Sequence, residues 1–311
     1  MTSWILLAVF GHVMNAIAFI IDKTLLKSTF KQGATYAILI SVLSTVVLFA
    51  TPWVTIWPSS EIIFSVVVFG LFQTFALWAF FEALKRGEAS RVVPIVGVFV
   101  ALFTFVGISL TIGEAFGMSQ YVGFALLVAS TGILAWGGEG GVGKIHSTVL
   151  YLSLISAALF AISSVSGKYA FASSDFLGVF VASRFYMVAG GFILLIAHRR
   201  ARMEIVRLCY PKKSNQETVS QRAVALTIIA QSAGAVGFIL VNYAISLGSA
   251  SLVNAMQAVQ YGLIVLVAWF GGKTLRRVLN ERRTPLIVIM KSIAIILVGI
   301  GLYLISRSTL S

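Results

Sequence analysis

The chain has 311 residues, of which 59% are hydrophobic and only 11% are charged, and its formal net charge is +13. Soluble domains are about a quarter charged, so this composition excludes an ordinary soluble protein. The single cysteine, Cys209, excludes an intramolecular disulfide framework. In a soluble protein the positive charge would indicate a nucleic-acid partner, but its placement along this chain gives another explanation.

Ten apolar stretches follow one another along the chain, and each is long enough to cross a bilayer. A helix rises about 1.5 Å per residue, so about 20 residues span a hydrocarbon core of about 30 Å. The backbone must satisfy its own hydrogen bonds there, which favours helices. The sequence therefore predicts an all-α polytopic membrane protein with ten transmembrane helices, at residues 3–22, 35–52, 61–84, 91–112, 117–136, 148–170, 176–197, 223–246, 249–271 and 284–306.

Lysines and arginines are concentrated on one side of the predicted membrane. Nineteen of them follow the first, third, fifth, seventh and ninth spans, whereas Lys168 and Arg307 lie toward the opposite side. Basic connections stay in the cytoplasm, so a multi-pass protein of the cytoplasmic membrane with both termini outside is predicted. The basicity reflects topology, and no nucleic-acid partner is expected. No basic leader precedes the first span, so we expect it to remain as an uncleaved anchor.

The chain repeats itself once, in units of five spans. The segments ASRV at 89–92 and ASLV at 250–253 each open a span. Because five is odd, the second unit must enter the membrane upside down relative to the first. Inverted repeats of this kind recur in transporters, with the substrate site near the midplane between the halves. The predicted organisation is a first five-helix repeat at 1–137, a cytoplasmic linker at 138–147, and a second repeat at 148–311 that contains the basic cytoplasmic loop 198–222.

Part of the first half resembles a known family. Residues 75–95, FALWAFFEALKRGEASRVVPI, are similar to the segment around the third and fourth helices of EamA-type members of the drug/metabolite transporter superfamily. Gly113 and Glu114, followed by Gly123 and the Gly-Ile-Leu at 132–134, fit the same pattern. The resemblance implies a ten-helix secondary carrier for small solutes such as amino acids, metabolites, drugs or nucleotide-linked sugars, without ATP hydrolysis.

The linker imitates a nucleotide-binding motif. Residues 138–144 read GEGGVGK, like a phosphate-binding loop, but Ile145 replaces the Ser or Thr that binds Mg²⁺. A helix precedes the segment where such a loop follows a strand. We interpret these glycines as a flexible connection between the halves.

Polar residues inside the first three spans are candidates for substrate binding, because a polar side chain that faces lipid is costly. His12, Asn15 and Asp22 share one face of the first span, and Gln73 lies near the centre of the third. These residues either line a substrate path or pack between helices. His12 is also the candidate proton-sensitive group, since an unperturbed histidine titrates near pH ~6.5.

The second half offers the strongest buried charge. Arg184 lies well inside the seventh span, where an arginine needs an anion, a wet cavity or a route to the interface. As a substrate anchor it would bind a carboxylate or phosphate through two parallel hydrogen bonds. Asn254, Gln257 and Tyr261 share a face of the ninth span and either bind a polar solute or join helices. Pro94 removes one helical hydrogen bond near the start of the fourth span.

These features predict a secondary transporter, not an enzyme, that uses alternating access and needs no cofactor or metal. The expected substrate is a small polar metabolite, amino acid-like and anionic or zwitterionic, with a proton as the candidate coupling ion. The first span carries no central carboxylate, which disfavours proton-coupled export of cationic drugs. Two alternatives stay open: a flippase for a lipid-linked sugar or other amphiphile, and a membrane receptor or scaffold that transports nothing.

Overall fold

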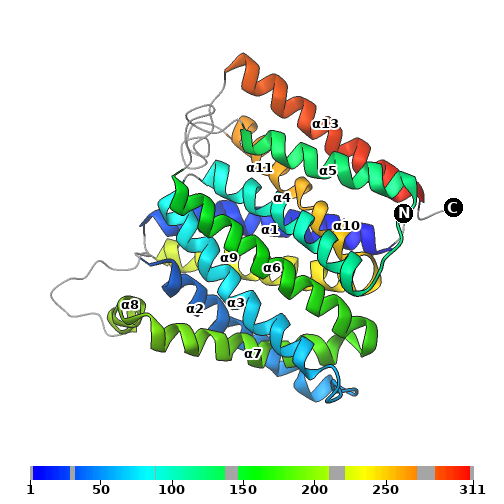
Figure 1. Cartoon of the computed structure of the whole chain (residues 1–311). Coiled ribbons are helices and arrows are strands. Elements are labelled where there is room, and N and C mark those ends of the chain that lie inside the picture. The colour runs from blue at the N-terminus through cyan, green and yellow to red at the C-terminus, as the bar shows by residue number, and fades with distance from the viewer. Residues whose placement is uncertain are drawn as a thin grey trace.

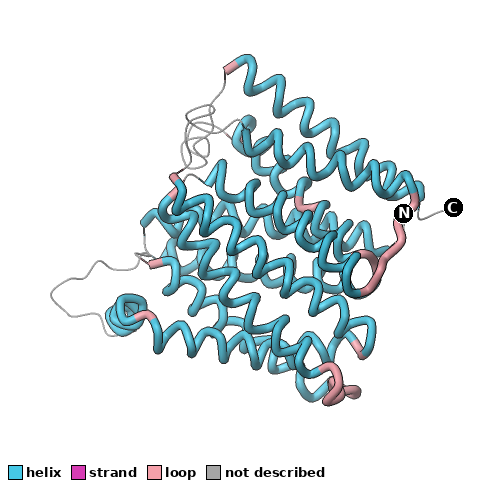
Figure 2. Tube along the Cα trace, viewed as in Figure 1, coloured by secondary structure: helices cyan, strands magenta, loops and turns pink. Residues whose placement is uncertain are grey.

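The computed structural model describes residues 3–28, 32–87, 89–136, 146–209, 221–271 and 284–308. Within these ranges the regular elements are all helices, and no strand occurs. The helices run side by side in one bundle (Figures 1 and 2). Most of the predicted linker 138–147, part of the basic loop 198–222 and the whole connection 272–283 lie outside the described residues.

The predicted spans coincide with helices to within a few residues at most ends. The first half contains α1 (Ser3–Ser28), α2 (Gly33–Leu43), η1 (Ser44–Trp53), α3 (Ile63–Arg86), α4 (Ala89–Thr111) and α5 (Met118–Trp136). The second half contains α6 (Ser147–Ser173), α7 (Phe176–Ala197), α8 (Arg199–Cys209), α9 (Gln221–Leu247), α10 (Ala250–Ala255), α11 (Ala258–Phe270) and α13 (Pro285–Ser308).

The described part of the chain contains nine helical stretches long and apolar enough to cross a membrane. Two of these stretches, Gly33–Trp53 and Ala250–Phe270, each combine two consecutive elements. A tenth helix, α5, is apolar over the shorter stretch Met118–Leu134. The all-helical membrane class is therefore confirmed, as a multi-pass protein.

The second predicted span changes its winding halfway. It begins as the α-helix α2 and continues as the tighter 3₁₀ helix η1. Within this stretch the hydroxyls of Ser44, Thr45 and Thr51 each donate to the carbonyl three residues earlier, at 2.6, 2.6 and 2.5 Å. These bonds match the three-residue spacing of a 3₁₀ helix.

The ninth predicted span is interrupted, whereas the fourth is not. The Gln257 N–H donates to the Asn254 carbonyl at 3.2 Å instead of to Val253, so the helix breaks between α10 and α11. The carbonyl of Val253 is thereby released from the helical pattern. Pro94, which removes one helical hydrogen bond, lies inside the continuous helix α4.

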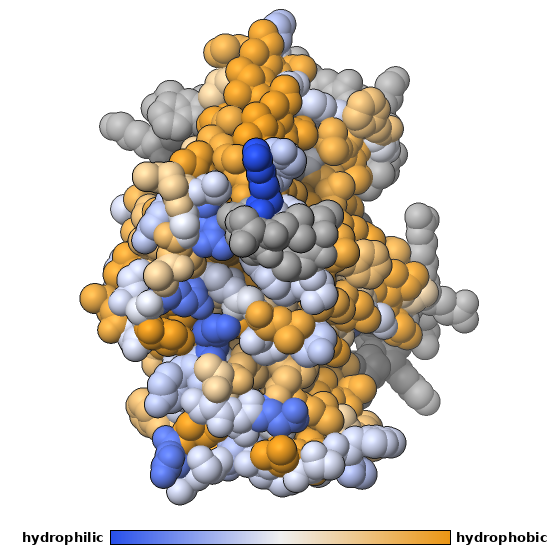
Figure 3. All heavy atoms as spheres, turned by 90° about the vertical axis from the view of Figure 1, so that its right-hand side faces the viewer, coloured by the Kyte–Doolittle hydropathy of each residue, from blue (hydrophilic) through white to orange (hydrophobic). Residues whose placement is uncertain are grey.

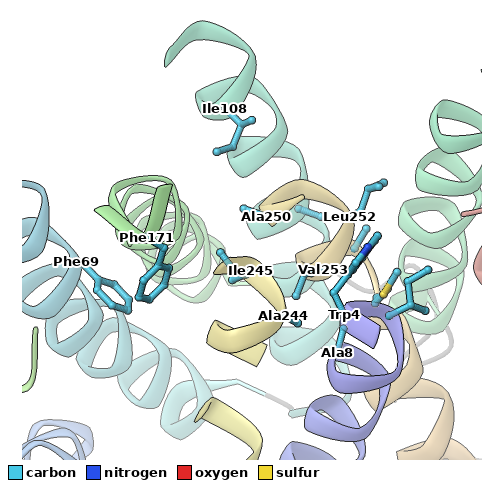
Figure 4. Close-up of a cluster of buried hydrophobic side chains, with 14 of the residues drawn as sticks. Trp4, Ala8, Phe69, Ile108, Phe171, Ala244, Ile245, Ala250, Leu252 and Val253 are labelled. Atoms are coloured by element: carbon cyan, nitrogen blue, oxygen red, sulfur yellow. The ribbon is translucent and has the colours of Figure 1, made fainter. Parts of the chain in front are cut away.

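Long helix pairs build the bundle. Helix α1 packs along α9, α3 packs along α6 and α7, and α5 packs along α13. The backbones of α1 and α9 approach closely at Gly11, since a Cβ added there would lie 3.0 Å from the Gly237 carbonyl oxygen. Small residues allow such approach between membrane helices. The central apolar cluster joins these pairs, with Phe69 and Phe171 facing each other and Val253 near Ala8 and Trp4 (Figure 4).

The two ends of the bundle differ. Ser3 and Ser308 lie at the same end, which we name the terminal end (Figure 1). At the opposite end, named the basic end, lie the end of α3 with Lys85 and Arg86, and helix α8. Seen from the terminal end, polar residues gather over the middle of the face, and apolar residues dominate the top and right flanks (Figure 3).

Candidate functional site

Arg184 of α7 is almost completely buried, with 2% of its surface exposed. One terminal nitrogen donates to the Ser183 hydroxyl at 2.9 Å, and the other donates to the Met187 sulfur at 3.3 Å. Its Nε lies 3.2 Å from the Ser183 hydroxyl and 3.4 Å from the Phe180 carbonyl oxygen. All of these acceptors are neutral and belong to α7 itself, and the burial of the side chain shows that it does not extend to the bundle surface.

Three phenylalanine rings from three helices surround the guanidinium. Its central carbon lies 4.6 Å from the ring centroid of Phe180 on α7, 4.9 Å from that of Phe238 on α9 and 5.5 Å from that of Phe69 on α3. Contacts of this kind stabilise a desolvated cation through the negative ring face. We name these three rings and Arg184 the arginine cage.

The arginine cage contains a cation but no anion. Among the described residues, no carboxylate lies within ion-pair distance of Arg184. A guanidinium has five N–H donors, and the bonds above occupy only three of them. Among the described residues, one donor on each terminal nitrogen has no acceptor, and a carboxylate could accept a hydrogen bond from each of these two donors.

Gln73 lies one helical turn from Phe69 on α3 and is also buried. Its side-chain oxygen accepts a hydrogen bond of 3.2 Å from the Ser163 hydroxyl of α6. The same hydroxyl donates to the Phe69 carbonyl at 2.8 Å. The structure thus places Gln73 beside the arginine cage, within a contact that joins α3 to α6.

His12 stabilises the break between α10 and α11. Its Nε2 lies 2.9 Å from the Val253 carbonyl oxygen, the group that the break releases, and donates to it. The second ring nitrogen, Nδ1, is buried without a hydrogen-bond partner in the described part of the chain, and the buried amide of Gln260 lies next to the ring. This geometry favours the packing interpretation of His12 over the proton-sensitive one.

We therefore expect His12→Ala to reduce the free energy of unfolding by about 1–3 kcal/mol, because the buried Val253 carbonyl loses its donor. His12→Gln, which keeps an N–H donor, should lose less. The check is thermal unfolding of both purified variants in detergent. If His12→Ala unfolds like wild type but transport loses its pH dependence between about pH 5 and 8, the residue is a proton site after all.

The three candidate binding residues of the ninth predicted span lie before, within and after the helix break. Asn254 on α10 donates to the hydroxyls of Thr104 at 3.0 Å and Ser164 at 2.9 Å, so it joins α10 to α4 and α6. Gln257 lies in the break itself and is half-buried. Tyr261 on α11 is buried, and its hydroxyl has no hydrogen-bond partner among the described residues.

Asn15 and Asp22 of α1 make contacts between helices. Asn15 is half-buried and packs against Gly237 of α9. The Asp22 carboxylate accepts a hydrogen bond from the Tyr36 hydroxyl of α2. That hydroxyl also accepts from the side-chain amide of Gln231 on α9 at 2.9 Å. Asp22, Tyr36 and Gln231 thus connect α1, α2 and α9 near the basic end.

The structure thus divides the predicted site residues into two groups. Arg184 and Gln73 lie at the arginine cage, whereas His12, Asn254, Gln257 and Tyr261 surround the helix break. Sequence reasoning missed the three rings of the cage, because phenylalanine is common throughout apolar spans. One signal was available, since Phe180 precedes Arg184 by four residues and must share its helix face.

Comparison with known proteins shows similarity in fold alone. No family model matches the chain, and no curated protein matches it. Among solved structures, 28 chains are similar. One of them, described only as the crystal structure of a protein, superposes with a TM-score of 0.68 over 97% of both chains at 14% identity. At this identity the likeness shows that the fold of the whole chain is shared, and nothing about activity.

Proposed function

We propose that this protein is a secondary transporter of a small anionic or zwitterionic metabolite, of the EamA type in the drug/metabolite transporter superfamily. The observation that carries the proposal is Arg184, a buried cation held by rings and neutral acceptors. A buried charge without an opposite charge costs several kcal/mol. A substrate carboxylate or phosphate that enters the arginine cage would supply the missing anion.

The aromatic walls indicate what the rest of the substrate is like. Phe69, Phe180 and Phe238 give an apolar surface around the charged edge, while Gln73 offers an uncharged amide one turn away. Such a site suits a compact molecule with one anionic group and a partly apolar body. An uncharged amide can meet a further polar group without the cost of burying another charge.

Ligand-dependent unfolding tests this assignment. A solute that binds the folded state at a concentration 100 times its Kd adds about 2.7 kcal/mol of stability. We expect small carboxylates and zwitterions in a metabolite panel to raise the Tm of the wild type and to leave Arg184→Gln unchanged. A panel in which only cationic or uncharged compounds raise the Tm would refute the anionic substrate.

The proposal includes ten transmembrane helices arranged as two inverted five-helix repeats. Under that scheme each helix corresponds to the one five spans later, so α1 corresponds to α6 and α3 to α9. The pairing of α1 with α9 then has an equivalent in the pairing of α6 with α3, and both pairs pack extensively. Helices α5 and α13, which correspond to each other, also pack together. In both pairs a helix of one half packs on a helix of the other half, as a two-fold relation between the halves requires. The packing therefore supports that relation.

Two sets of polar contacts, one at the terminal end of α9 and one farther along the helix toward the basic end, support alternating access. At the terminal end, the Lys168 ammonium of α6 donates to the carbonyls of Ile245 at 3.1 Å and Gly248 at 2.6 Å. The Ser249 hydroxyl donates to Glu114 at 2.6 Å. We name these contacts the terminal latch.

A second set of contacts lies nearer the basic end. We name the hydrogen-bonded residues Asp22, Tyr36 and Gln231 the basic latch. Gln231 and Ile245 are 14 residues apart, which is about 21 Å along the helix.

Weakening the two latches should have opposite effects. In a Cys209→Ser background, Ser164→Cys places a thiol beside Asn254, between the latches. We expect Lys168→Met to increase its reaction with an impermeant maleimide applied to the terminal end by severalfold, because that end opens more often. Tyr36→Phe should increase the reaction from the basic end instead. If each variant increased the rate of thiol modification equally from both ends, the two ends would not open independently.

The orientation in the membrane is part of the proposal. The asymmetry of lysines and arginines puts the basic end in the cytoplasm. A reporter enzyme active only outside the cytoplasm should therefore work when fused after Ser311 and fail when inserted in the loop 198–222. The reverse pattern would overturn the orientation without affecting the fold.

A further inference from the structure

Helix α8 is a feature that transport itself does not require. It begins at Arg199, directly after the membrane helix α7, whose end is marked by His198. The sequence predicted only a connection here, and the structure shows an 11-residue helix with a strongly one-sided distribution of side chains. In Figure 1 α7 is seen lengthwise and α8 is seen end-on, so α8 lies crosswise to α7 at the basic end of the bundle.

One face of α8 is attached to the bundle. Ala201 is buried and packs in a cluster with residues of α2, α3 and α7. Glu204 accepts a hydrogen bond of 2.8 Å from the Thr35 hydroxyl of α2. The only acidic side chain of α8 is therefore turned toward the protein and is engaged there.

The opposite face combines arginines with apolar side chains. Met203 and Val206 are 43% and 53% exposed, although both are apolar. The exposed arginines around them are Arg199, Arg200, Arg202 and Arg207. On a helical projection Met203 and Val206 lie together, with Arg202 on one flank and Arg207 on the other. This pattern is typical of helices that lie in a bilayer interface.

We propose that α8 binds anionic phospholipid headgroups of the bilayer that surrounds the protein. Its position directly after a membrane span puts it at headgroup depth. Met203 and Val206 enter the boundary of the acyl chains, and the arginines contact phosphates around them. Each basic residue near an anionic surface contributes about a fivefold increase in affinity. The inference needs only a multi-pass membrane protein and does not depend on transport.

A charge-removal experiment on the full-length protein tests the source of the affinity. Phosphatidylglycerol is titrated against phosphatidylcholine in mixed micelles, and the Tm is followed. We expect wild type to be stabilised by phosphatidylglycerol, and the triple variant Arg200→Gln, Arg202→Gln, Arg207→Gln to need at least about tenfold more of it. The matched control removes the same number of charges from the connection 272–283, as Arg276→Gln, Arg277→Gln and Arg282→Gln, and should shift the midpoint less than the α8 variant does if α8 makes a contribution of its own.

A depth measurement tests the position of the apolar stripe. In the Cys209→Ser background, a fluorophore on Val206→Cys in liposomes should be quenched by nitroxide lipids more than by iodide in water. Adding phosphatidylglycerol should increase that difference in wild-type α8 but not in the triple arginine variant. Equal shifts for the two arginine triples, or a fluorophore at position 206 that iodide quenches freely, would overturn the proposal.

Discussion

Arg184→Ala should abolish transport of the anionic substrate while leaving a folded protein. Arg184 is 2% exposed and supplies the only positive charge of the arginine cage, so alanine leaves three phenylalanine rings facing an anion. Losing a bidentate, charge-assisted contact in a buried site costs about 2–5 kcal/mol, which is about 30-fold to several thousandfold in affinity. The measurement is the initial rate of uptake into proteoliposomes at several substrate concentrations.

Replacing Arg184 with lysine tests whether the positive charge alone is sufficient or whether the shape of the guanidinium is also needed. Arg184→Lys keeps a positive charge but lacks the planar fork and the stacking on Phe180 and Phe238, so we expect poor rescue. Since removal of an uncompensated buried cation relieves a cost, Arg184→Ala should also unfold at the same temperature as wild type or a higher one. Normal transport by both variants would show that Arg184 does not contact the substrate.

Gly70→Ala should be the most destabilising single-methyl change in the bundle core around the site. A Cβ at position 70 would lie 2.2 Å from the Ser183 carbonyl oxygen and 3.0 Å from the Met187 backbone nitrogen, so α3 and α7 must separate. Overpacking of this kind costs about 1–3 kcal/mol. Ser183 and Met187 are also the hydrogen-bond partners of Arg184, so substrate affinity should fall together with the Tm.

Gly132→Ala is the matched control for this change. Gly132 lies in helix α5, and in the described part of the chain no atom of another helix lies within 4 Å of a Cβ added there. Alanine in a helix interior is favoured over glycine by about 0.5–1 kcal/mol, so this variant should unfold at the same temperature as wild type or slightly higher. Thermal unfolding of the two variants side by side gives the comparison. A Gly70→Ala protein as stable as Gly132→Ala would show that α3 and α7 are not in close contact.

Hydropathy was sufficient to predict most of the fold. Runs of apolar residues fix where helices cross a membrane, because the bilayer imposes their length and excludes unpaired backbone groups. Glu82 and Arg86, which are four residues apart on α3, form an ion pair at 3.1 Å, as this spacing favours. Such features depend only on neighbours along the chain or on the surrounding lipid.

Features that depend on contacts between distant segments could not be predicted. The break at Gln257 carries no proline, and it is stabilised by His12, which lies 241 residues away from Val253. Pro94, which cannot donate a helical hydrogen bond, lies by contrast in the continuous helix α4. The rings around Arg184 come from three helices, so no local pattern could have assembled them.

Helix α8 escaped prediction for a different reason. A charged segment between two apolar spans is typical of an exposed loop, and mean hydropathy hides an amphipathic helix. Only the alternation of arginines with Ala201, Met203, Ile205 and Val206 indicates two faces. A helical projection of the segment 199–209 would have found it.

The most direct test of the central claim is solute flux through the purified protein in proteoliposomes, using a metabolite panel with and without a pH gradient. We predict saturable uptake of one or a few small carboxylates or zwitterions, and no such uptake by Arg184→Ala. The same vesicles should show no scrambling of a fluorescent lipid. Lipid scrambling without solute flux would indicate a flippase, and neither activity under any gradient would contradict a transporter altogether.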